Sequence, residues 1–246
     1  MSGIDHLDGP GGRRLAYVKT EGQGPCVVFL SGFKSDMEGT KAIHLEAWAK
    51  RQGRAFLRFD YSGHGASGGA FEEGCIGDWA ADAEAVIAAA TSGPVILVGS
   101  SMGGWIASLL SKRLDRIAGF VGIAAAPDFT EDGFWAHFSD AQRGRIMNEG
   151  QLALPSDYDE PYIITRRLIE DGRDRLVLRS PLPMPFPVRL LQGTEDGSVT
   201  RETALRLLDH IDGSDVRLTF VKGADHRFSD DACLDLIEAS IRDISG

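Results

Sequence analysis

The sequence has few cysteines, less positive than negative charge, and no long apolar run. Three cysteines, Cys26, Cys75 and Cys233, occur in 246 residues, and no two of them have the close spacing of zinc ligands. We therefore expect unpaired, inert thiols and no metal site. Lys and Arg number 26 against 36 Asp and Glu, so the net charge is −10. This excess of acid disfavours a nucleic-acid partner and electrostatic binding to anionic lipid surfaces.

The sequence also lacks the signals of membrane insertion and targeting. No apolar run comes near the roughly 18 residues that a membrane-spanning helix needs. The first ten residues have neither the cationic tip and apolar core of a secretory signal nor the Arg-rich composition of a transit peptide. We therefore predict a cytoplasmic protein without a membrane span.

What the sequence does contain is an alternation of short apolar runs and amphipathic segments. Strands are predicted at 14–20, which we place at a sheet edge, and at 26–30, 55–59, 95–98, 117–124, 188–191 and 216–221. Helices are predicted at 41–51, 78–90, 103–112, 202–211 and 231–244. In the first helix, Ile43, Ala47 and Trp48 are expected to form the apolar side. The alternation predicts an α/β fold, with a mainly parallel sheet and helices on both faces.

The segment from about 128 to 180 interrupts this alternation. It is rich in aromatic residues, and Pro155 and Pro161 break it. Alternate prolines from Pro181 to Pro187 then impose an extended path that suits neither a helix nor a central strand. We therefore predict one α/β domain over residues 1–246, with a small and mostly helical cap inserted at about 128–180.

The apolar run at 95–98 is followed directly by Gly99-Ser100-Ser101-Met102-Gly103. This pattern, G-x-S-x-G between a strand and a helix, is typical of a very tight turn that holds its central serine at positive φ. The two glycines suit the positions that such a turn brings close together. We predict Ser101 as a nucleophile, with Ser100 as a spacer.

A serine nucleophile needs a base, and in this architecture the base is a histidine late in the chain. His226 falls in the loop after the last predicted strand, which ends at the same sheet edge as Ser101. His210 lies within a predicted amphipathic helix, and we interpret it as a surface residue. His64 precedes the serine turn, in a Gly-rich stretch that we interpret as a loop shaping the fold. We predict His226 as the base.

The acid that orients the histidine is expected after the strand at 188–191. Two carboxylates follow that strand, Glu195 and Asp196. We predict Asp196, with Glu195 as the alternative. Asp225, beside the histidine, is expected to point elsewhere.

An oxyanion hole needs two backbone N–H groups near the nucleophile. The first is predicted from Met102, the residue after the serine. The second is predicted from Phe33, in the loop that follows the strand at 26–30. Gly32 in that loop allows the backbone to approach closely, and it is a candidate substrate-binding residue.

The order and placement of the predicted nucleophile, acid, base and oxyanion loop resemble those of the serine α/β-hydrolases. The chain is similar over nearly its whole length to the abhydrolase-domain branch described as mitochondrial palmitoyl-protein thioesterase and mycophenolic acid acyl-glucuronide esterase. The resemblance lies in residues 29–42, 58–63, 101–105 and 225–227, and its most specific strings are Gly39-Thr40-Lys41-Ala42 and Asp225-His226-Arg227. It implies the α/β-hydrolase fold and cleavage of acyl esters or thioesters through Ser101, Asp196 and His226, without a cofactor. We interpret the chain as a bacterial-type relative.

Several functional alternatives stay open at this point. Phe134, Trp135 and Phe138 are candidates for an acyl pocket, but their spacing also fits packing within the cap. A small-molecule ester or thioester is the expected substrate. A C–C bond hydrolase or a perhydrolase would use the same residues, and a ligand-binding receptor on a hydrolase scaffold is a further alternative. A serine in the turn excludes a haloalkane dehalogenase or an epoxide hydrolase, which need a carboxylate there.

Overall fold

The computed structural model describes residues 3–155 and 161–245. Residues 156–160 of the predicted cap, and 1–2 and 246 of the predicted domain, lie outside this part. The strands are β1 (Asp5–Asp8), β2 (Arg14–Thr20), β3 (Gln23–Leu30), β4 (Arg54–Phe59), β5 (Val95–Ser100), β6 (Ile117–Ile123), β7 (Gln151–Leu154), β8 (Tyr162–Thr165), β9 (Leu182–Pro183), β10 (Val188–Gly193), β11 (Ile211–Asp212) and β12 (Val216–Val221). The helices are α1 (Thr40–Arg51), α2 (Ile76–Ala90), α3 (Met102–Leu110), α4 (Asp140–Glu149), α5 (Arg166–Arg173), α6 (Arg201–His210) and α7 (Asp231–Asp243), with 3-10 turns η1 (Pro10–Gly12) and η2 (Phe71–Glu73) and a π-helix η3 (Phe129–Trp135).

The main sheet has eight strands in the order β1-β2-β4-β3-β5-β6-β10-β12. All neighbours from β4 to β12 are parallel, and β1 and β2 are antiparallel to their neighbours. This confirms the predicted α/β fold with a mainly parallel sheet. The edge position predicted for the strand at 14–20 is wrong, because β1 pairs outside β2. β1 is four residues long and mostly exposed, so it has little of the apolar signal that identifies a strand.

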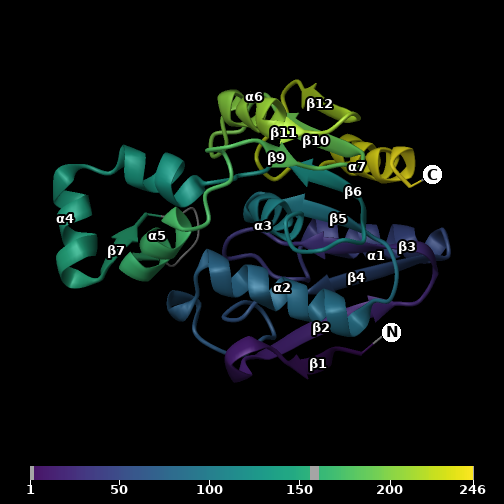
Figure 1. Cartoon of the computed structure of the whole chain (residues 1–246), viewed down its shortest axis with the longest axis horizontal. Helices are drawn as coiled ribbons and strands as arrows, with labels where there is room; N and C mark the ends of the chain where they lie inside the picture. Colours follow the sequence, from purple (N-terminus) through teal and green to yellow (C-terminus); the bar gives the residue numbers. More distant parts are fainter. Residues whose placement is uncertain (1–2, 156–160, 246) are drawn as a thin grey trace.

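Helices cover both faces of the sheet (Figure 1). On β3, Val27 and Phe29 pack with the core under α1 and α7, whereas Val28 and Leu30 pack with the core under α2 and α3. Because both faces of the strand are covered, its side chains are apolar without alternation. The carboxyl ends of β3, β5, β10 and β12 meet at one edge of the sheet, where the predicted site residues follow them.

The apolar side predicted for α1 is wrong in two of its three residues. Trp48 is buried, but Ile43 is 38% exposed and Ala47 is also exposed. The helix instead packs through Ala42, Leu45, Trp48 and Ala49. The buried face also carries Glu46, whose carboxylate accepts a hydrogen bond from Arg58 on β4. A buried ion pair on this face makes its hydropathy a poor guide to which side is covered.

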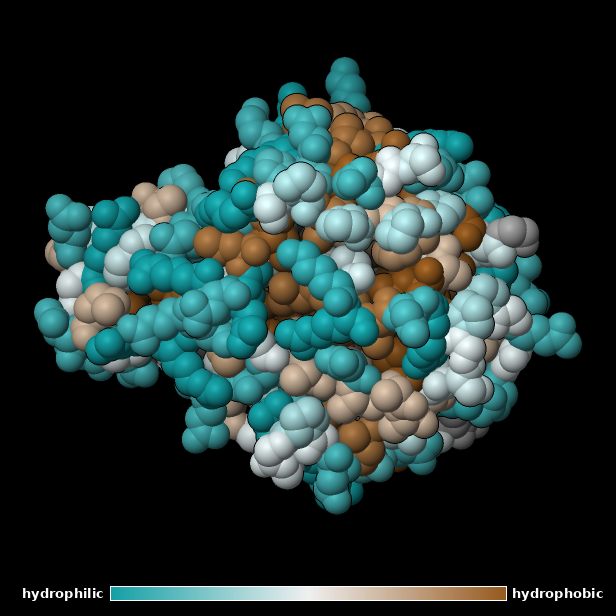
Figure 2. Space-filling view, viewed as in Figure 1, coloured by the Kyte–Doolittle hydropathy of each residue, from teal (hydrophilic) through white to brown (hydrophobic). Residues whose placement is uncertain are grey.

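The segment between β6 and β10, residues 124–187, is called the insert here. It holds η3, α4, the antiparallel pair β7–β8, and α5, and most of it projects beside the sheet (Figure 1). The β7–β8 pair was not predicted in this mostly helical region. Leu152 and Ile164 are its buried, paired positions, and strands of four residues give too short a pattern to recognise. In space-filling view, the outer surface of the insert is largely hydrophilic, and apolar side chains appear where it meets the rest of the chain (Figure 2).

The Gly-rich stretch after β4 shapes the fold, as predicted. Its turn closes around Asp60, whose buried carboxylate accepts hydrogen bonds from the N–H groups of Met37 and Ala66. Gly65 has φ 45°, and a Cβ there would collide with the Asp60 carboxylate. Asp60 thereby ties this stretch to the loop that follows β3. That loop also carries Gly32 and Phe33.

Candidate active site

Ser101 lies at the turn between β5 and α3, with φ 53° and ψ −116°. This is the positive φ that the sequence pattern predicts, in a region where non-glycine residues are strained. A Cβ at Gly99 would meet the carbonyl oxygen of Gly103, and a Cβ at Gly103 would collide with the carbonyl oxygen of Leu30. The two glycines therefore permit a turn that a larger residue would open.

His226 reaches Ser101 from the loop after β12. Its Nε2 lies 3.1 Å from Ser101 Oγ. Its other ring nitrogen, Nδ1, lies 2.9 Å from Asp196 Oδ2. The structure thus brings together the three residues predicted as nucleophile, base and acid, in a continuous line of hydrogen bonds. With Nδ1 protonated toward Asp196, Nε2 is free to accept the serine proton.

Asp196 is held firmly in this line. Its Oδ1 accepts the backbone N–H groups of Ser198 and Val199, each at 2.8 Å, and its Oδ2 accepts from Gln192 Nε2 as well as from His226. Burial raises the pKa of the Asp196 carboxyl, but the hydrogen bonds from His226, Val199 and Ser198 outweigh burial and leave that pKa below its usual range. The carboxylate is therefore ionised at neutral pH and suited to stabilising an imidazolium.

The alternatives considered for the acid do not reach the histidine. Glu195 is exposed to solvent, and it has no hydrogen bond to His226 among the described residues. Asp225 instead accepts the N–H of Phe228 through Oδ1. The geometry favours Asp196 over both.

Two other histidines weighed from the sequence, His210 and His64, lie away from the serine turn. His210 places Nδ1 2.8 Å from the carbonyl oxygen of Arg206, within its own helix. His64 is buried among the rings of Tyr61, Phe71 and Trp79, with Nδ1 3.1 Å from the carbonyl oxygen of Ser62. Within the described ranges, neither has a contact with Ser101.

The loop after β3 lies directly against Ser101. A Cβ built on Gly32 would stand 3.4 Å from the Cβ of Ser101, so this glycine lets the loop backbone approach the serine. In the part of the chain that the structure describes, no acceptor takes the N–H of Phe33 or of Met102. Both predicted oxyanion donors are therefore free to bind a ligand oxygen.

The ring of Phe33 is the centre of an aromatic cluster over this loop. Its centroid lies between 4.9 and 6.2 Å from the centroids of Phe71, Trp79, Phe129, Phe134 and Tyr162. Of these rings, Phe129, Phe134 and Tyr162 come from the insert, and Phe134 stacks on Phe138. The insert is thus joined to the predicted oxyanion loop by aromatic contacts.

The structure separates Trp135 from its two neighbours in the predicted acyl pocket. The Trp135 ring has the guanidinium of Arg173 4.4 Å from its centroid and that of Arg143 5.6 Å away. None of its ring contacts among the described residues is with Phe33. Trp135 therefore packs within the insert, whereas Phe134 and Phe138 belong to the aromatic cluster.

Sequence reasoning did not assign Phe71 and Trp79 to the site. Both come from the region around η2 and α2, far along the chain from the insert. Their contact with Phe33 depends on tertiary packing, and no local pattern signals it.

The three cysteines are buried and unpaired as expected, and burial raises the pKa of Cys26 to about 11.

Over residues 3–155 and 161–245, no group of three or more His, Cys, Asp or Glu side chains is arranged to hold a metal ion. Within the same ranges, no helix combines the length and hydropathy of a membrane span.

Comparison with known proteins gives consistent matches. The model of the alpha/beta hydrolase family matches residues 27–239. The chain is 35% identical to the mitochondrial palmitoyl-protein thioesterase ABHD10 of Bos taurus, over 98% of this chain and 79% of that protein. It is 34% identical to the protein of the same name from Homo sapiens, with the same coverage of 98% and 79%.

Two solved structures are similar over nearly their whole length. A putative hydrolase from Agrobacterium vitis has a TM-score of 0.94 and 38% identity, covering 100% of this chain and 99% of that one. Alpha/beta hydrolase domain-containing protein 10 from mouse has a TM-score of 0.91 and 32% identity, covering 99% of this chain and 98% of that one. Both the sequence and the fold are therefore similar to those of known hydrolases.

Proposed function

The chain belongs to the alpha/beta hydrolase family, and on that premise we propose that it cleaves carboxylic ester or thioester bonds through an acyl-enzyme on Ser101. The observation that carries this proposal is the line of hydrogen bonds from Ser101 Oγ through His226 to Asp196, at 3.1 and 2.9 Å. Such a line supplies the base that a serine hydroxyl needs in order to act as a nucleophile. Similarity to ABHD10 supports the ester or thioester bond as the target.

Acylation follows from this geometry. His226 Nε2 accepts the proton of Ser101 as Oγ attacks the acyl carbonyl, and Asp196 stabilises the imidazolium that forms. The carbonyl oxygen becomes an oxyanion, which the N–H groups of Phe33 and Met102 bind. Removal of one such donor typically raises the barrier by about 3–4 kcal/mol. The imidazolium then protonates the leaving alcohol or thiol, and the acyl group stays on Ser101.

Deacylation repeats these steps with water. His226 accepts a proton from a water molecule that attacks the acyl carbonyl, and the same two N–H groups bind the second oxyanion. Collapse of this intermediate breaks the bond to Oγ, and the proton held by His226 returns to Ser101. The acid is released and the enzyme is restored. Every proton in the cycle passes between the substrate, water, Ser101 and His226.

We propose that the acyl group binds against the aromatic cluster around Phe33. Phe134 from the insert lies beside this ring, next to the loop that carries the predicted oxyanion donor, and Phe138 stacks on Phe134. Aromatic faces bury apolar chains well and place them beside the reacting carbonyl. The part of the insert predicted as a cap, at about 128–180, would then cover the acyl group. The relatives named as palmitoyl-protein thioesterases support an apolar acyl chain.

The test compares hydrolysis of p-nitrophenyl esters, from acetate to palmitate, by the wild type and Ser101→Ala. We expect the variant to lose at least 99.9% of kcat, because it has no nucleophile. Ser111→Ala, at the far end of α3, is the matched control and should keep wild-type kcat. Retention of more than a tenth of the rate in Ser101→Ala would reject the acyl-enzyme. Absence of turnover in the wild type, with tight ligand binding, would favour a receptor on a hydrolase scaffold.

A further inference from the structure

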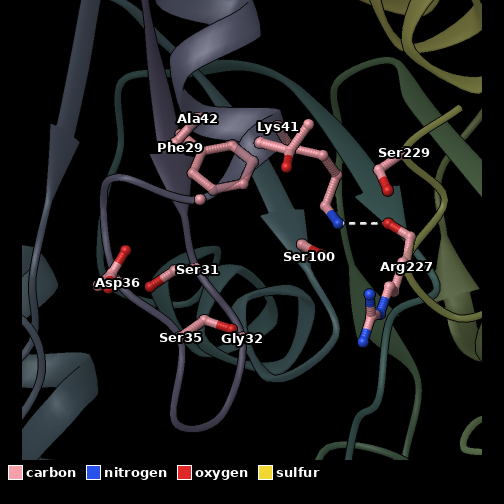
Figure 3. Close-up of a pocket in the computed structure, with 12 residues that line it drawn as sticks. Phe29, Ser31, Gly32, Ser35, Asp36, Lys41, Ala42, Ser100, Arg227 and Ser229 are labelled. Atoms are coloured by element: carbon pink, nitrogen blue, oxygen red, sulfur yellow. Dashed lines mark hydrogen bonds between the residues drawn. The ribbon is translucent and has the colours of Figure 1, made fainter. Parts of the chain in front are cut away.

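A cavity lies beside the predicted active site, behind the loop that follows β3. Its volume is about 240 Å³, and Figure 3 shows the side chains around it. It adjoins Ser101 through Gly32 and Ser100, yet neither Ser101 nor His226 lines it. Its wall also includes Ser31, Asp36, Arg227 and the start of α1, with Lys41.

The amino-terminal end of α1 forms one wall of this cavity. The helix runs for 12 residues from Thr40, and its N-cap, Gly39, has no side chain to satisfy the first N–H groups. In the described part of the chain, no acceptor takes the N–H of Thr40, Lys41 or Ala42. The first turn of a helix concentrates partial positive charge and unpaired donors, which together attract an anion.

One buried serine hydroxyl on the cavity wall lacks a partner. Ser31 is 2% exposed, and its Oγ has no hydrogen-bond partner in the described structure. Ser100 also lines the cavity and is 6% exposed; its hydroxyl makes no hydrogen bond in the described structure but remains accessible from the cavity. Buried hydroxyls are normally paired, because an unpaired one loses its bonds to water without replacement. The unpaired Ser31 hydroxyl is explained if a ligand in the cavity pairs with it.

Two cationic side chains stand at the same cavity. The ammonium group of Lys41 donates a hydrogen bond to the carbonyl oxygen of Arg227 (Figure 3). This bond uses one of the three N–H donors of Lys41. The guanidinium of Arg227 has no ion pair among the described residues, although most arginines of this chain have one. Asp36 is the one acidic residue on the cavity wall, and its Oδ1 accepts the N–H of Glu38.

We infer that this cavity is a binding site for an anionic group, a carboxylate or a phosphate. The first turn of α1, Lys41 and Arg227 would hold its charge, and the hydroxyls of Ser31 and Ser100 would donate to its oxygens. The anion is either a free ion or a charged group on the substrate. The second source rests on the proposed function, because the substrate would then extend from Ser101 past Gly32 into the cavity. The first source does not depend on catalysis.

Binding of a free anion is measured by titrating inorganic phosphate into Ser101→Ala in a calorimeter, at constant ionic strength set with chloride. Arg227→Gln is compared in the same background. We expect phosphate to bind and the Arg227 variant to weaken it about tenfold, the usual effect of losing one charge-assisted hydrogen bond. Arg14→Gln is the matched control, since Arg14 is exposed on β2, has no ion pair in the described residues, and lies away from the cavity.

Binding of a charged substrate group is measured by kinetics with two matched esters. One is neutral, o-nitrophenyl butyrate, and the other, 3-butyryloxy-4-nitrobenzoate, has the same acyl chain and a carboxylate on its leaving group, because the acyl chain itself is proposed to bind against the aromatic cluster. We expect the ratio of kcat/KM, charged over neutral, to fall about tenfold in Arg227→Gln and to stay constant in Arg14→Gln. Using the ratio cancels any general effect of the substitution on catalysis.

The outcomes separate the two sources and test the site itself. Phosphate binding that depends on Arg227 supports a site for free anions. A change in the ester ratio without phosphate binding supports a site for a charged group of the substrate. Ser100→Ala, which removes a hydroxyl without a partner, should fold normally and show the same losses to a smaller extent. The inference is overturned if neither phosphate binding nor the ester ratio depends on Arg227.

A failure of the proposed function would look different. Calorimetry in Ser101→Ala detects the anion whether or not the wild type is an esterase. Turnover of p-nitrophenyl butyrate that survives in Ser101→Ala would reject the nucleophile and leave the anion site untouched.

Discussion

Ser100 and Ser101 are adjacent in the sequence, yet Ser101 faces His226 whereas Ser100 lines the neighbouring cavity. Ser101 Oγ lies 3.1 Å from His226 Nε2. Ser100 lies on the wall of the neighbouring cavity, with no partner among the described residues. The positive φ of Ser101 causes this separation, because it turns the chain between the end of β5 and the start of α3. One tight turn thus places the proposed nucleophile at one site and a hydroxyl at the proposed anion site.

The acid is tested by comparing Asp196→Asn with Glu195→Gln. We expect Asp196→Asn to lower kcat by about 10⁴-fold, since an amide favours the wrong tautomer of His226. Glu195→Gln should stay within twofold of the wild type, because Glu195 is exposed and has no bond to the histidine. The opposite ranking of the two kcat values would assign the acid to Glu195.

The aromatic cluster is tested by the acyl-length preference of two variants. Phe134→Ala removes a ring that contacts Phe33 and stacks on Phe138. We expect it to shift the optimum acyl length of p-nitrophenyl esters by two or more carbons. Trp135→Ala should leave the optimum unchanged, because Trp135 packs against Arg173 and Arg143. A shift in Trp135→Ala alone would remove Phe134 from the acyl pocket.

The tight turn at Ser101 is tested by stability. Gly103→Ala should lower the free energy of unfolding by roughly 1–3 kcal/mol, because its methyl group collides with the carbonyl oxygen of Leu30. Gly144→Ala is the control, since Gly144 lies in α4 with open space around it. It should raise the free energy of unfolding by about 0.5–1 kcal/mol. Urea denaturation gives both values, and equal effects would contradict the close packing of the turn.

The pH dependence of anion binding follows from Lys41. Burial lowers the pKa of Lys41 to about 8, and of the groups near it, Asp225 and Cys233 oppose this shift while Arg227 adds to it. A bound anion favours the ammonium form, so affinity is highest below pH 8 and falls as pH rises through 8. The Cys233 thiol has its pKa raised to about 11 by burial and stays neutral in this range.

Sulfate is the probe for this dependence, because its charge is constant between pH 6.5 and 9.5, whereas that of phosphate is not. Calorimetry should show affinity for sulfate falling up to about tenfold over that range, the effect of losing one charged hydrogen-bond donor. Lys41→Arg keeps its charge throughout and should give a flat profile. A profile that falls equally in Lys41→Arg would assign the titration to another group.

The residues of the predicted triad could be found from sequence because each follows a strand of the same parallel sheet. Ser101 follows β5, Asp196 follows β10 and His226 follows β12, and the carboxyl ends of parallel strands meet at one edge. The glycines flanking Ser101 also signal their turn directly. The choice between Glu195 and Asp196 needed coordinates, because adjacent residues in a loop point in different directions.

Other parts of the site depend on packing that no local pattern records. Phe33 meets Phe71 from η2 and Phe134 from the insert, at centroid distances of 4.9 and 6.2 Å. The cavity at α1 is lined by Lys41 and Arg227. Neither residue has a role predicted from the sequence, although both lie in the two most specific strings of the resemblance. Their contact forms only when the start of α1 is placed beside the loop after β12.

The most direct test of Ser101 as the nucleophile is to identify the residue that becomes covalently modified. The protein is treated with a fluorophosphonate, which reacts with activated serines, and the modified peptide is sequenced by mass spectrometry. We expect one label per chain on Ser101, none on Ser100, and loss of labelling in His226→Ala. A label on Ser100, or labelling that persists without His226, would contradict this expectation.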